Sequence, residues 1–339
     1  MATESGFPTA GGRLDVKPDL SVVIVSYNTR ELLVECLESL YGPDQEFSFE
    51  TIIVDNDSSD GTVEAVLAAF PQVRLINNDV NLGFGMAMNR GAEIARGRYL
   101  VVLNPDTIVP PETLPCLLDY LETRKFPRVV SCRLVGLDGV NQLSCARFPT
   151  PLRIFMLFTR LGKLIPVESI QSYYEKFDWK LLTLSEASEN TIEKVDTVLG
   201  AFFILPLETF NRVDGFDERF FMHYEEIDLM KKLNSIGCNT YINPNVEVVH
   251  YGGQSTVQDY ENMRFEQQRS LLLYLHKWHG TIPAQTIRYF LIVLALIRYV
   301  DAVLTEKLRP RDLSGRKFRN ASRVILTGLL RMHFQTPVD

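Results

Sequence analysis

The sequence predicts an α/β fold: a Rossmann-like, mostly parallel sheet flanked by helices, followed by a helical C-terminal extension. Two observations carry this prediction. Over the first 120 residues, short runs of β-branched and other apolar residues alternate with segments whose apolar residues recur at helical spacing. Each apolar run is also followed by a turn rich in Asn, Asp, Gly or Pro. Strands that alternate with helices are typical of right-handed βαβ units on a parallel sheet.

The first half of the chain contains four predicted strands. They lie at residues 19–26, 50–54, 73–77 and 100–103. The near-continuous apolar runs indicate strands that are buried on both faces of a parallel sheet. Thr29 is a candidate N-cap for the helix after the first strand, and a helix over about 86–95 returns the chain to the fourth strand.

Polar residues follow three of these strands, at 26–28, 55–58 and 104–106. The carboxyl ends of parallel strands meet at one edge of an open α/β sheet, where ligands bind. Asp106 follows Pro105, which cannot extend the strand, and a carboxylate there suits a hard divalent cation that also binds phosphate oxygens. Taken alone, Asn-Pro-Asp is more often an ordinary turn. The sequence lacks the glycine-rich dinucleotide and P-loop motifs, so it favours a nucleotide-sized site of another type.

The second half of the sheet is predicted from shorter signals. A strand at 130–135 precedes a tight turn at Asp138-Gly139, which suggests a hairpin. Residues 149–190 are aromatic and mixed in charge without a clear period, and we interpret them as a partly helical insertion. These features place an irregular region after the first five strands.

One long buried strand is expected at 195–205, with Gly200 inside it. A glycine within a strand often marks a bulge or the close approach of a ligand. Two short strands are expected at 238–242 and 247–249, and the second of these delivers His250. Between them and the long strand, an acidic segment enters a helix that ends near residue 236.

Composition limits the class of protein. The chain has 339 residues, of which 46% are apolar and 23% charged, and its net charge is −7. Neutralising nucleic-acid phosphates needs a basic face, so a general nucleic-acid binder is not expected. The five cysteines are scattered, which fits reduced thiols rather than a zinc site or a disulfide framework. With no secretory signal at the N-terminus, these features predict a cytoplasmic protein.

The expected organisation is a loose tail over 1–18, a catalytic domain over 19–257 with halves at 19–120 and 121–257, and an extension over 258–339. The extension is helical in character over 258–305, and residues 307–323 are basic. Its predicted apolar face comprises Leu271, Leu272, Leu275, Phe290, Leu291, Leu294 and Ile297. Such a helix beside a basic segment can bind anionic lipid without spanning the bilayer. A helix packed on the preceding domain, with a solvated basic end, is an equal alternative.

Four segments, in this order, resemble family 2 glycosyltransferases, which have the GT-A fold. They are Ser-Val-Val-Ile-Val-Ser-Tyr-Asn at 21–28, Ile-Ile-Val-Asp-Asn-Asp-Ser-Ser-Asp-Gly-Thr at 52–62, Asn-Asn-Asp-Val-Asn-Leu-Gly-Phe-Gly at 77–85, and Leu-Asn-Pro-Asp-Thr at 103–107. Two later segments, at 138–150 and 216–229, look most like the bacterial rhamnosyltransferase branch. The resemblance covers roughly residues 19–280.

The resemblance implies a nucleotide diphospho-sugar donor together with Mg²⁺ or Mn²⁺. The positions matched to the nucleoside are Ser26, Asn28, Asp55 and Asp57, and those matched to the loop and helix beside the nucleotide and the donor sugar are Asn81, Gly83 and Asn89. Asp106 matches the last carboxylate of the Asp-x-Asp metal motif, and His250 matches a histidine that completes the metal site in several relatives. The first Asp of that motif is Asn104 here, which leaves one charged ligand fewer.

The resemblance also implies the catalytic base. Glu225-Glu226 matches the acidic pair that supplies it, with Glu226 at the base position and Glu225 or Asp228 as the second choice. The implied reaction is a single displacement that inverts the anomeric centre, in which Glu226 takes the proton of the acceptor hydroxyl. Without the resemblance, these residues would be read as the solvated acidic first turn of a helix.

The expected function is therefore hexosyl transfer in cell-surface polysaccharide synthesis. The preferred donor is dTDP-L-rhamnose, and the acceptor is a saccharide or a lipid-linked saccharide, used in the cytoplasm or at the inner face of the cytoplasmic membrane. Two alternatives stay open. A sugar nucleotidyltransferase would be expected to carry a basic triphosphate loop near the first strand, where only Arg30 is available. A non-catalytic nucleotide-sugar-binding scaffold would fit Asn104. The sequence predicts no oligomeric state.

Overall fold

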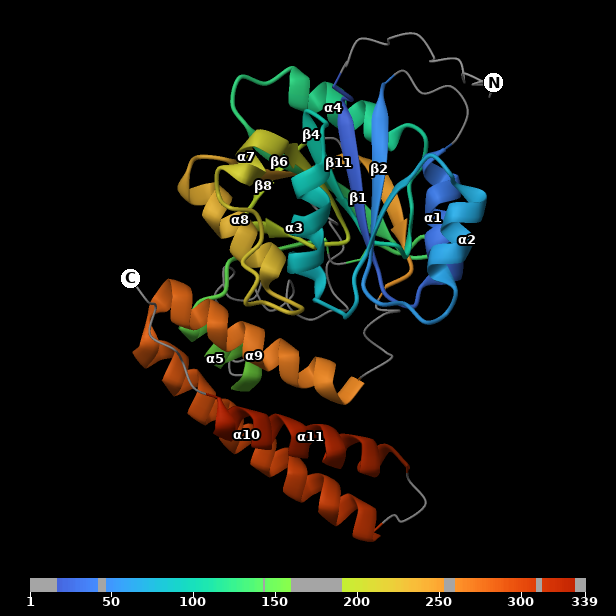
Figure 1. Cartoon of the computed structure of the whole chain (residues 1–339). Helices are drawn as coiled ribbons and strands as arrows, with labels where there is room; N and C mark the ends of the chain where they lie inside the picture. Colours follow the sequence, from blue (N-terminus) through green and yellow to red (C-terminus); the bar gives the residue numbers. More distant parts are fainter. Residues whose placement is uncertain are drawn as a thin grey trace, which may run out of the picture.

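The computed structural model describes residues 17–41, 47–142, 144–159, 191–252, 260–308 and 313–332. A nine-stranded sheet with flanking helices forms one part of the molecule, and three C-terminal helices lie beside the edge of that sheet (Figure 1). The predicted α/β class with a helical extension is confirmed. Most of the predicted tail, 1–16, and most of the predicted insertion, 160–190, lie outside the described residues.

The four strands predicted in the first half are present and parallel. They are β1 (Leu20–Ser26), β2 (Phe49–Asp55), β3 (Arg74–Asn77) and β4 (Tyr99–Leu103), in the spatial order β3-β2-β1-β4. The connecting helices are α1 (Arg30–Leu40), α2 (Thr62–Ala69) and α3 (Phe84–Ile94). Thr29 precedes α1 as predicted, but its hydroxyl bonds to that of Ser26 instead of capping the helix.

The second half turns the sheet into a mixed one. Its strands are β5 (Thr107–Ile108), β6 (Arg128–Val135), β8 (Glu193–Val195), β10 (Phe202–Pro206) and β11 (Asn239–His250), whereas β7 (Cys145–Ala146) and β9 (Thr197–Val198) form a separate pair. The helices are α4 (Thr113–Glu122), α5 (Pro151–Thr159), α7 (Leu207–Asn211) and α8 (Glu225–Ser235). Strand β10 runs antiparallel between β4 and β6, so the order continues as β4-β10-β6-β11-β5.

Two sequence-based strand boundaries were wrong. The single strand expected at 195–205 is broken at Asp196 and at Leu199–Ala201, because its parts pair with different partners: β8 with β11, β9 with β7, and β10 with β4. The two short strands expected at 238–242 and 247–249 are one strand, β11, whose register against β6 shifts between Asn243 and Glu247. The turn at Asp138-Gly139 is confirmed, but the chain returns through one isolated bridge and forms no second strand there.

Two hydrophobic cores cover the two faces of the sheet. One is formed with α1, α2 and α4, and the other with α3, α7 and α8. Between them they bury strands β1, β4 and β10 on both faces, which explains the continuous apolar runs of the sequence. The central strands therefore present only their ends to solvent.

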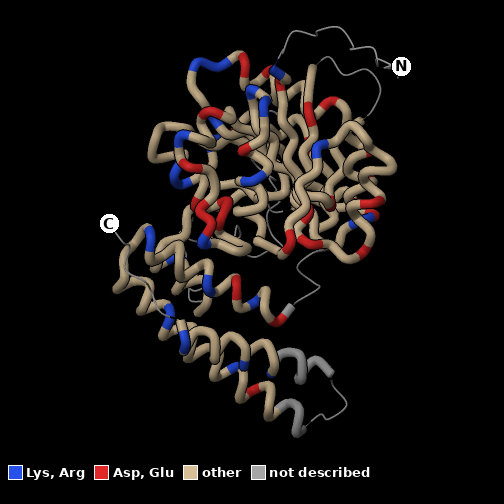
Figure 2. The backbone as a smooth tube through the Cα atoms, in the orientation of Figure 1, with Lys and Arg blue, Asp and Glu red and all other residues tan. Residues whose placement is uncertain are grey.

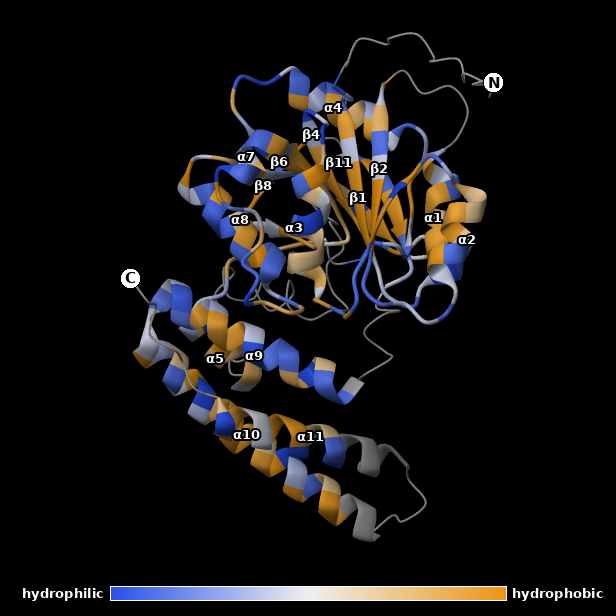
Figure 3. Ribbon diagram, in the orientation of Figure 1, coloured by the Kyte–Doolittle hydropathy of each residue, from blue (hydrophilic) through white to orange (hydrophobic). Residues whose placement is uncertain are grey.

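The C-terminal helices are α9 (Tyr260–His279), α10 (Thr281–Leu308) and α11 (Leu313–Arg331), and they share a third core with α5. Four residues of the predicted apolar face, Leu271, Leu272, Leu275 and Leu291, are buried between these helices, whereas Ile297 is exposed. Figure 3 shows apolar segments all along α10. Within the part of the chain that the structure describes, no helix is long and apolar enough to cross a membrane.

Candidate active site

The carboxyl ends of β1, β2 and β4 meet at the sheet edge that faces the C-terminal helices (Figure 1). Ser26 is in register with Asp55 across β1 and β2, and Ile24 is in register with Leu103 across β1 and β4. The polar residues that follow these strands are therefore gathered at one edge, as predicted. The site has one end at β1 and β2, which is called the nucleoside end below because the sequence predicts the nucleoside there, and a second end beyond β4.

Asp106 and His250 come together beyond β4. The short strand β5 pairs antiparallel with the end of β11, which sets Thr107 opposite His250. The backbone N–H of Tyr251 donates to the carbonyl of Asp106 over 2.9 Å, and Asp106 Oδ1 lies 3.4 Å from His250 Nε2. Both side chains are only 8% exposed. A carboxylate and an imidazole are thus fixed side by side in a largely buried position.

Gln142 fixes the orientation of the imidazole. Its amide nitrogen donates to the carbonyl of His250 over 2.6 Å, and its amide oxygen lies 2.8 Å from His250 Nδ1. Because that oxygen can only accept, Nδ1 carries a hydrogen, and in a neutral imidazole Nε2 then has its lone pair on the side of Asp106. The carboxylate and the neutral ring thus offer a cation two ligand atoms that lie 3.4 Å apart. Gln142 orients the imidazole, as hydrogen bonds to metal-binding histidines commonly do.

Asp106 and His250 fit a divalent cation, but they cannot satisfy it alone. No third Asp, Glu, His or Cys joins them in the described ranges. A hard cation such as Mg²⁺ commonly keeps only one or two protein carboxylates and takes its other ligands from water and phosphate. Asn104 lies two residues before Asp106, where its N–H donates to the carbonyl of Ala201 over 2.9 Å. The donor set is therefore one that a diphosphate would complete.

Glu225 and Glu226 begin α8 after a strained turn. His223 and Tyr224, the two residues before them, both adopt left-handed backbone conformations with φ of 67° and 68°. Such conformations are costly for residues with a side chain and cluster at functional sites. One oxygen of each glutamate, Oε2, is buried and has no hydrogen-bond partner among the described residues.

Burial controls the protonation of this pair. It raises the pKa of Glu226 to about 7, well above its usual value of 4.5. Burial also raises the pKa of Glu225, and the negative charge of Glu226 adds to that effect. Two close, desolvated carboxyl groups do not ionise together readily. A carboxylate whose pKa lies near neutrality is suited to accept a proton in a reaction.

Glu226 lies close to the turn that follows β4. A methyl group added at Gly200 would lie 3.6 Å from Cβ of Glu226, and the neighbouring carbonyl of Ala201 accepts the N–H of Asn104. The turn at Leu199–Ala201 therefore contacts Glu226 through Gly200 and the Asn104–Asp106 turn through Ala201. Gly200 was predicted to mark a close approach, and here its missing side chain leaves room beside Glu226.

Asp228 does not share the surroundings of this pair. Its side chain is fully buried, and both of its oxygens are occupied: Lys277 Nζ donates to one and Trp278 Nε1 to the other, each over 2.7 Å. The Lys277 ammonium also donates to Asp217 over 2.7 Å, and with Arg219 it holds the pKa of Asp217 below its usual value despite burial. These contacts anchor α8 on α9. The sequence gives no local signal for them, because Asp228 and Lys277 are 49 residues apart.

The nucleoside end is built from two linked turns. Asn28 N–H donates to Ser58 Oγ over 2.9 Å, and Asn28 Oδ1 accepts the N–H of Ser59 over 2.8 Å. Asp55 is fully buried; its Oδ2 accepts the N–H of Ser58 over 2.8 Å. Its Oδ1 is buried without a hydrogen-bond partner among the described residues, which leaves an acceptor for a donor group of a ligand.

The other residues predicted for the nucleoside have different environments. Ser26 is fully buried and its hydroxyl lies 2.9 Å from that of Thr29. Asp57 is exposed and, like Asn28, adopts a left-handed backbone conformation. Asn28 and Asp57 therefore both lie in tight turns. Ser26 closes β1 beneath these turns, and Asp57 is accessible to a ligand.

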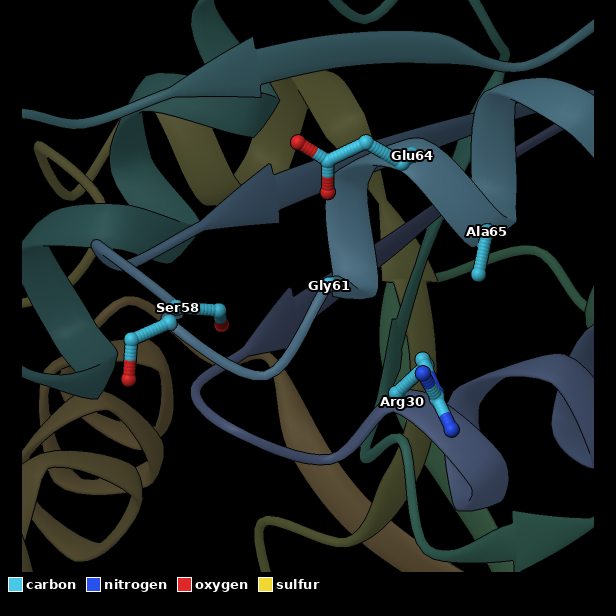
Figure 4. A pocket seen from close by; sticks show the side chains of 6 residues that line it. Arg30, Ser58, Gly61, Glu64 and Ala65 are labelled. Carbon is cyan, nitrogen blue, oxygen red and sulfur yellow. The ribbon is translucent and has the colours of Figure 1, made fainter.

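A hollow of about 690 Å³ opens beside the nucleoside end (Figure 4). Its walls come from the start of α1, the turn after β2 and the start of α2, and the residues that line it are Arg30, Ser58, Ser59, Gly61, Glu64 and Ala65. Ser58 and Ser59 are the residues bonded to Asn28 and Asp55. The hollow is thus the outer part of the nucleoside end, and none of the residues predicted for the metal or the base lines it.

The loop over 81–85 closes the site on the side of the glutamates. Asn81 Oδ1 accepts the N–H of Gly83 over 2.9 Å, and Phe84 N–H donates to the carbonyl of Phe221 over 2.9 Å. Gly83 has φ +81°, and a Cβ there would lie 2.2 Å from that same carbonyl, so only glycine fits. The loop is therefore pressed against the segment that leads to Glu225.

The side-chain amide of Asn89 holds Phe216, at the start of the segment that leads to Glu225. Its amide oxygen accepts the N–H of Phe216 over 2.8 Å, and its amide nitrogen donates to the carbonyl of Phe216 over 2.9 Å. Both ends of the amide are thus engaged with protein, although the sequence predicted that Asn89 borders the donor sugar. The structure gives Asn89 a supporting place in the site.

Comparisons with known proteins find sequence relatives among glycosyltransferases. Residues 21–173 match the family model described as glycosyl transferase family 2. The N-acetylglucosaminyl-diphospho-decaprenol L-rhamnosyltransferase of Mycobacterium tuberculosis is 28% identical over 274 residues, which cover 77% of this chain and 85% of the relative. The rhamnosyltransferase WbbL of Escherichia coli is 25% identical over 241 residues, covering 68% and 82% of the two chains.

Solved structures show the same fold. The mannosyltransferase PcManGT from Pyrobaculum calidifontis, in complex with GDP-Man and Mn²⁺, covers 94% of this chain and 87% of its own at a TM-score of 0.50 and 16% identity. GalNAc-T7 with UDP, GalNAc and Mn²⁺ covers 91% and 55% at a TM-score of 0.52 and 15% identity. With the family match over residues 21–173 and the two relatives, the chain is a glycosyltransferase of the GT-A fold whose sequence is similar to family 2 glycosyltransferases and, among them, to rhamnosyltransferases.

Proposed function

We propose that this chain transfers a sugar, with inversion, from a nucleotide diphospho-sugar to a hydroxyl group of a saccharide or lipid-linked saccharide. The observation that carries the proposal is the desolvated Glu226 carboxylate, which lies against Gly200 next to the turn that holds Asp106. A proton acceptor and a cation-binding pair therefore meet at one sheet edge. This is the arrangement that a displacement at an anomeric carbon needs.

The donor is proposed to lie along the strand ends, with its nucleoside at β1 and β2. The unpaired Oδ1 of Asp55 would accept a hydrogen bond from the base, and the turn of Asn28 and Asp57 would hold the ribose side. We propose L-rhamnose from dTDP-rhamnose as the donor, since two relatives that cover most of this chain are named rhamnosyltransferases.

Asp106 and His250 would hold Mg²⁺ or Mn²⁺ next to the diphosphate, with Gln142 keeping Nε2 of His250 turned toward the site. The bound cation would supply charge stabilisation of the departing diphosphate. Asn104 contributes no charge at the first position of the motif. We therefore expect an appreciable part of the cation's affinity to depend on the donor, and an Asp106→Ala variant to lose metal-dependent donor binding.

Glu226 is proposed to act as the general base. As the new bond forms between the acceptor oxygen and the anomeric carbon, the bond from that carbon to the diphosphate oxygen breaks, and the hydroxyl proton passes to Glu226. Because the pKa of Glu226 lies at about 7, its ionised form is available at neutral pH and can hold the proton afterwards. Glu225, whose pKa is also raised, would stay protonated beside it. Asp228 would position α8 through Lys277 and Trp278 without contacting substrate.

The acceptor is proposed to be a saccharide carried on a lipid, within the synthesis of a cell-envelope polysaccharide. The printed name of the mycobacterial relative describes a polyprenyl-diphosphate-linked acceptor, and that relative is matched over 77% of this chain. We propose that this chain reaches such an acceptor at the cytoplasmic face of a membrane.

The decisive experiment measures hydrolysis and binding of a panel of nucleotide sugars by the full chain, with and without Mn²⁺ or Mg²⁺. We expect metal-dependent turnover of dTDP-rhamnose, and its loss in Glu226→Gln with nucleotide binding retained. Turnover of a different sugar would correct the donor only. Binding without turnover, by the natural protein and with candidate acceptors present, would replace catalysis by the scaffold alternative.

A further inference from the structure

Helix α10 carries an unpartnered apolar stripe. Its large apolar side chains are between 48% and 80% exposed at seven positions: Ile282, Tyr289, Val293, Leu296, Ile297, Val300 and Leu304. These positions recur every three or four residues after residue 289, so they lie on one face of the helix. At 1.5 Å per residue, the stripe from Ile282 to Leu304 is about 33 Å long.

The opposite face of the same helix is already used. Its buried residues are Ala284, Ile287, Leu291, Ala295 and Ala302, and α10 packs against α9 and α11. Scattered exposed apolar residues are normal on protein surfaces, but a contiguous stripe marks an interaction surface. The stripe is therefore not part of the fold of this helical region. It is a second apolar face on a helix whose first face holds the helices together (Figure 3).

The helices around the stripe are positively charged. The described side chains of 281–304 and 319–332 include five arginines and one aspartate, a net charge of +4: Arg288, Arg298, Arg319, Arg323, Arg331 and Asp301. The whole chain has a net charge of −7, so the remaining residues carry −11. Figure 2 shows blue Lys and Arg positions along α10 and α11. The chain thus concentrates positive charge where it exposes apolar side chains.

We propose that the α10 stripe is a membrane-docking surface, which lies in the headgroup region of a bilayer that contains anionic lipids. An exposed apolar helix face with arginines around it is what interfacial binding to anionic lipid requires. Pairing with a second copy through the same face would instead bring two helical regions of charge +4 together. This inference rests on the proposed function, because a lipid-linked acceptor has to be reached at a membrane.

Docking through α10 would also orient the enzyme. The α9–α11 helices lie on the side of the sheet to which β1 and β2 point, so the strand ends that carry the site face them (Figure 1). A bilayer bound at α10 would hold the active-site edge on the membrane side. Helix α9, between the sheet and α10, would set the height of that edge above the lipid.

The test uses flotation of the purified full chain with vesicles of phosphatidylcholine, with and without phosphatidylglycerol. We expect binding to the anionic vesicles that weakens in high salt. In the double variant Val293→Gln, Ile297→Gln, the partition coefficient should fall at least about tenfold, because two apolar side chains no longer insert. The matched control is Phe126→Gln, Leu137→Gln, which removes two exposed apolar residues (74% and 69% exposed) of the sheet domain and should bind as the natural chain does.

Three results would overturn the proposal. They are failure of the natural chain to bind anionic vesicles, equal binding by the α10 variant, and light scattering that shows a dimer which the α10 substitutions dissociate. The last would assign the stripe to a second copy. Hydrolysis of nucleotide sugar without vesicles is measured in parallel and should be unchanged in the α10 variant. If vesicle binding holds while no nucleotide sugar is bound or turned over, the proposed function fails and the docking surface stands.

Discussion

Replacing Glu226 by Gln is expected to make the protein more stable while it removes activity, and the gain in stability should depend on pH. The Glu226 carboxylate is desolvated, and its Oε2 has no hydrogen-bond partner among the described residues. A neutral amide of nearly the same shape would not suffer this loss of hydration. The site therefore holds an unfavourable charge, which is the charge that the proposed role of Glu226 as the base needs.

The size of the effect follows from the pKa. Burial moves the pKa of Glu226 from 4.5 to about 7, and at 1.36 kcal/mol per unit this corresponds to about 3 kcal/mol. Between these pH values the folded state binds more protons than the unfolded state, so the free energy of unfolding falls as pH rises through this window. In the Gln variant this dependence is absent. The variant should therefore match the natural protein near pH 4.5 and exceed it by about 3 kcal/mol at pH 8.

Urea unfolding at pH 5 and pH 8 measures this difference, and glycosyl transfer is assayed on the same preparations. Removing the charge of Glu226 also removes a cause of the raised pKa of Glu225, so the remaining carboxyl should titrate at lower pH than in the natural protein. Glu38→Gln, at an exposed position of α1, serves as the control and should change stability little at either pH. An equal gain at both pH values, or no gain at pH 8, would refute the assignment of Glu226 as a desolvated base.

Two further predictions concern residues that support the site. Lys277→Met should lower the free energy of unfolding by about 3–5 kcal/mol, because it leaves the fully buried Asp228 with Trp278 as its remaining partner. Urea denaturation measures this loss, and adding Asp228→Asn to the same chain should restore part of the stability. A loss under about 1 kcal/mol would contradict the ion pair. Gln142→Leu should weaken the affinity for Mn²⁺ about 10- to 100-fold in the presence of nucleoside diphosphate, because the His250 ring is no longer held in one orientation. Calorimetric titration measures this affinity, and an unchanged value would show that Gln142 does not orient His250 for the cation.

The nucleotide-binding half could be predicted from the sequence because its signals are local. Each parallel strand is a short apolar run, and polar residues of the site stand at its end or just beyond it, such as Asp55 at the end of β2 and Asp106 after β4. In a parallel sheet these ends must lie at the same edge, whichever order the strands take. The contact between Asp106 and His250 was harder, and there the resemblance to a family supplied the pairing that β5 and β11 create.

The second half could not be predicted to the same degree, because an apolar run does not show with which strand it pairs. Residues 195–205 look like one strand, yet the chain uses them for three strands in two sheets and turns at Gly200. The turn places Gly200 beside Glu226. The break in this apolar run, which the sequence pattern does not show, is therefore part of the candidate site. Likewise, the apolar residues of α10 predict a helix, but helix packing alone decides which face is covered.

The contacts of α9 argue that the catalytic unit extends beyond the last strand of the sheet, although the sequence suggested a boundary at 257. Lys277 and Trp278 satisfy the buried Asp228, and Ser270 Oγ donates to the carbonyl of Met222 over 2.8 Å. These bonds fix both the first turn of α8 and the strained segment before it. A chain that ended at 257 would leave Asp228 without Lys277 and Trp278, in the first turn of the helix that carries the proposed base. We infer that α9 belongs to the structure that positions the base, and that the outward role of the C-terminal region begins with α10.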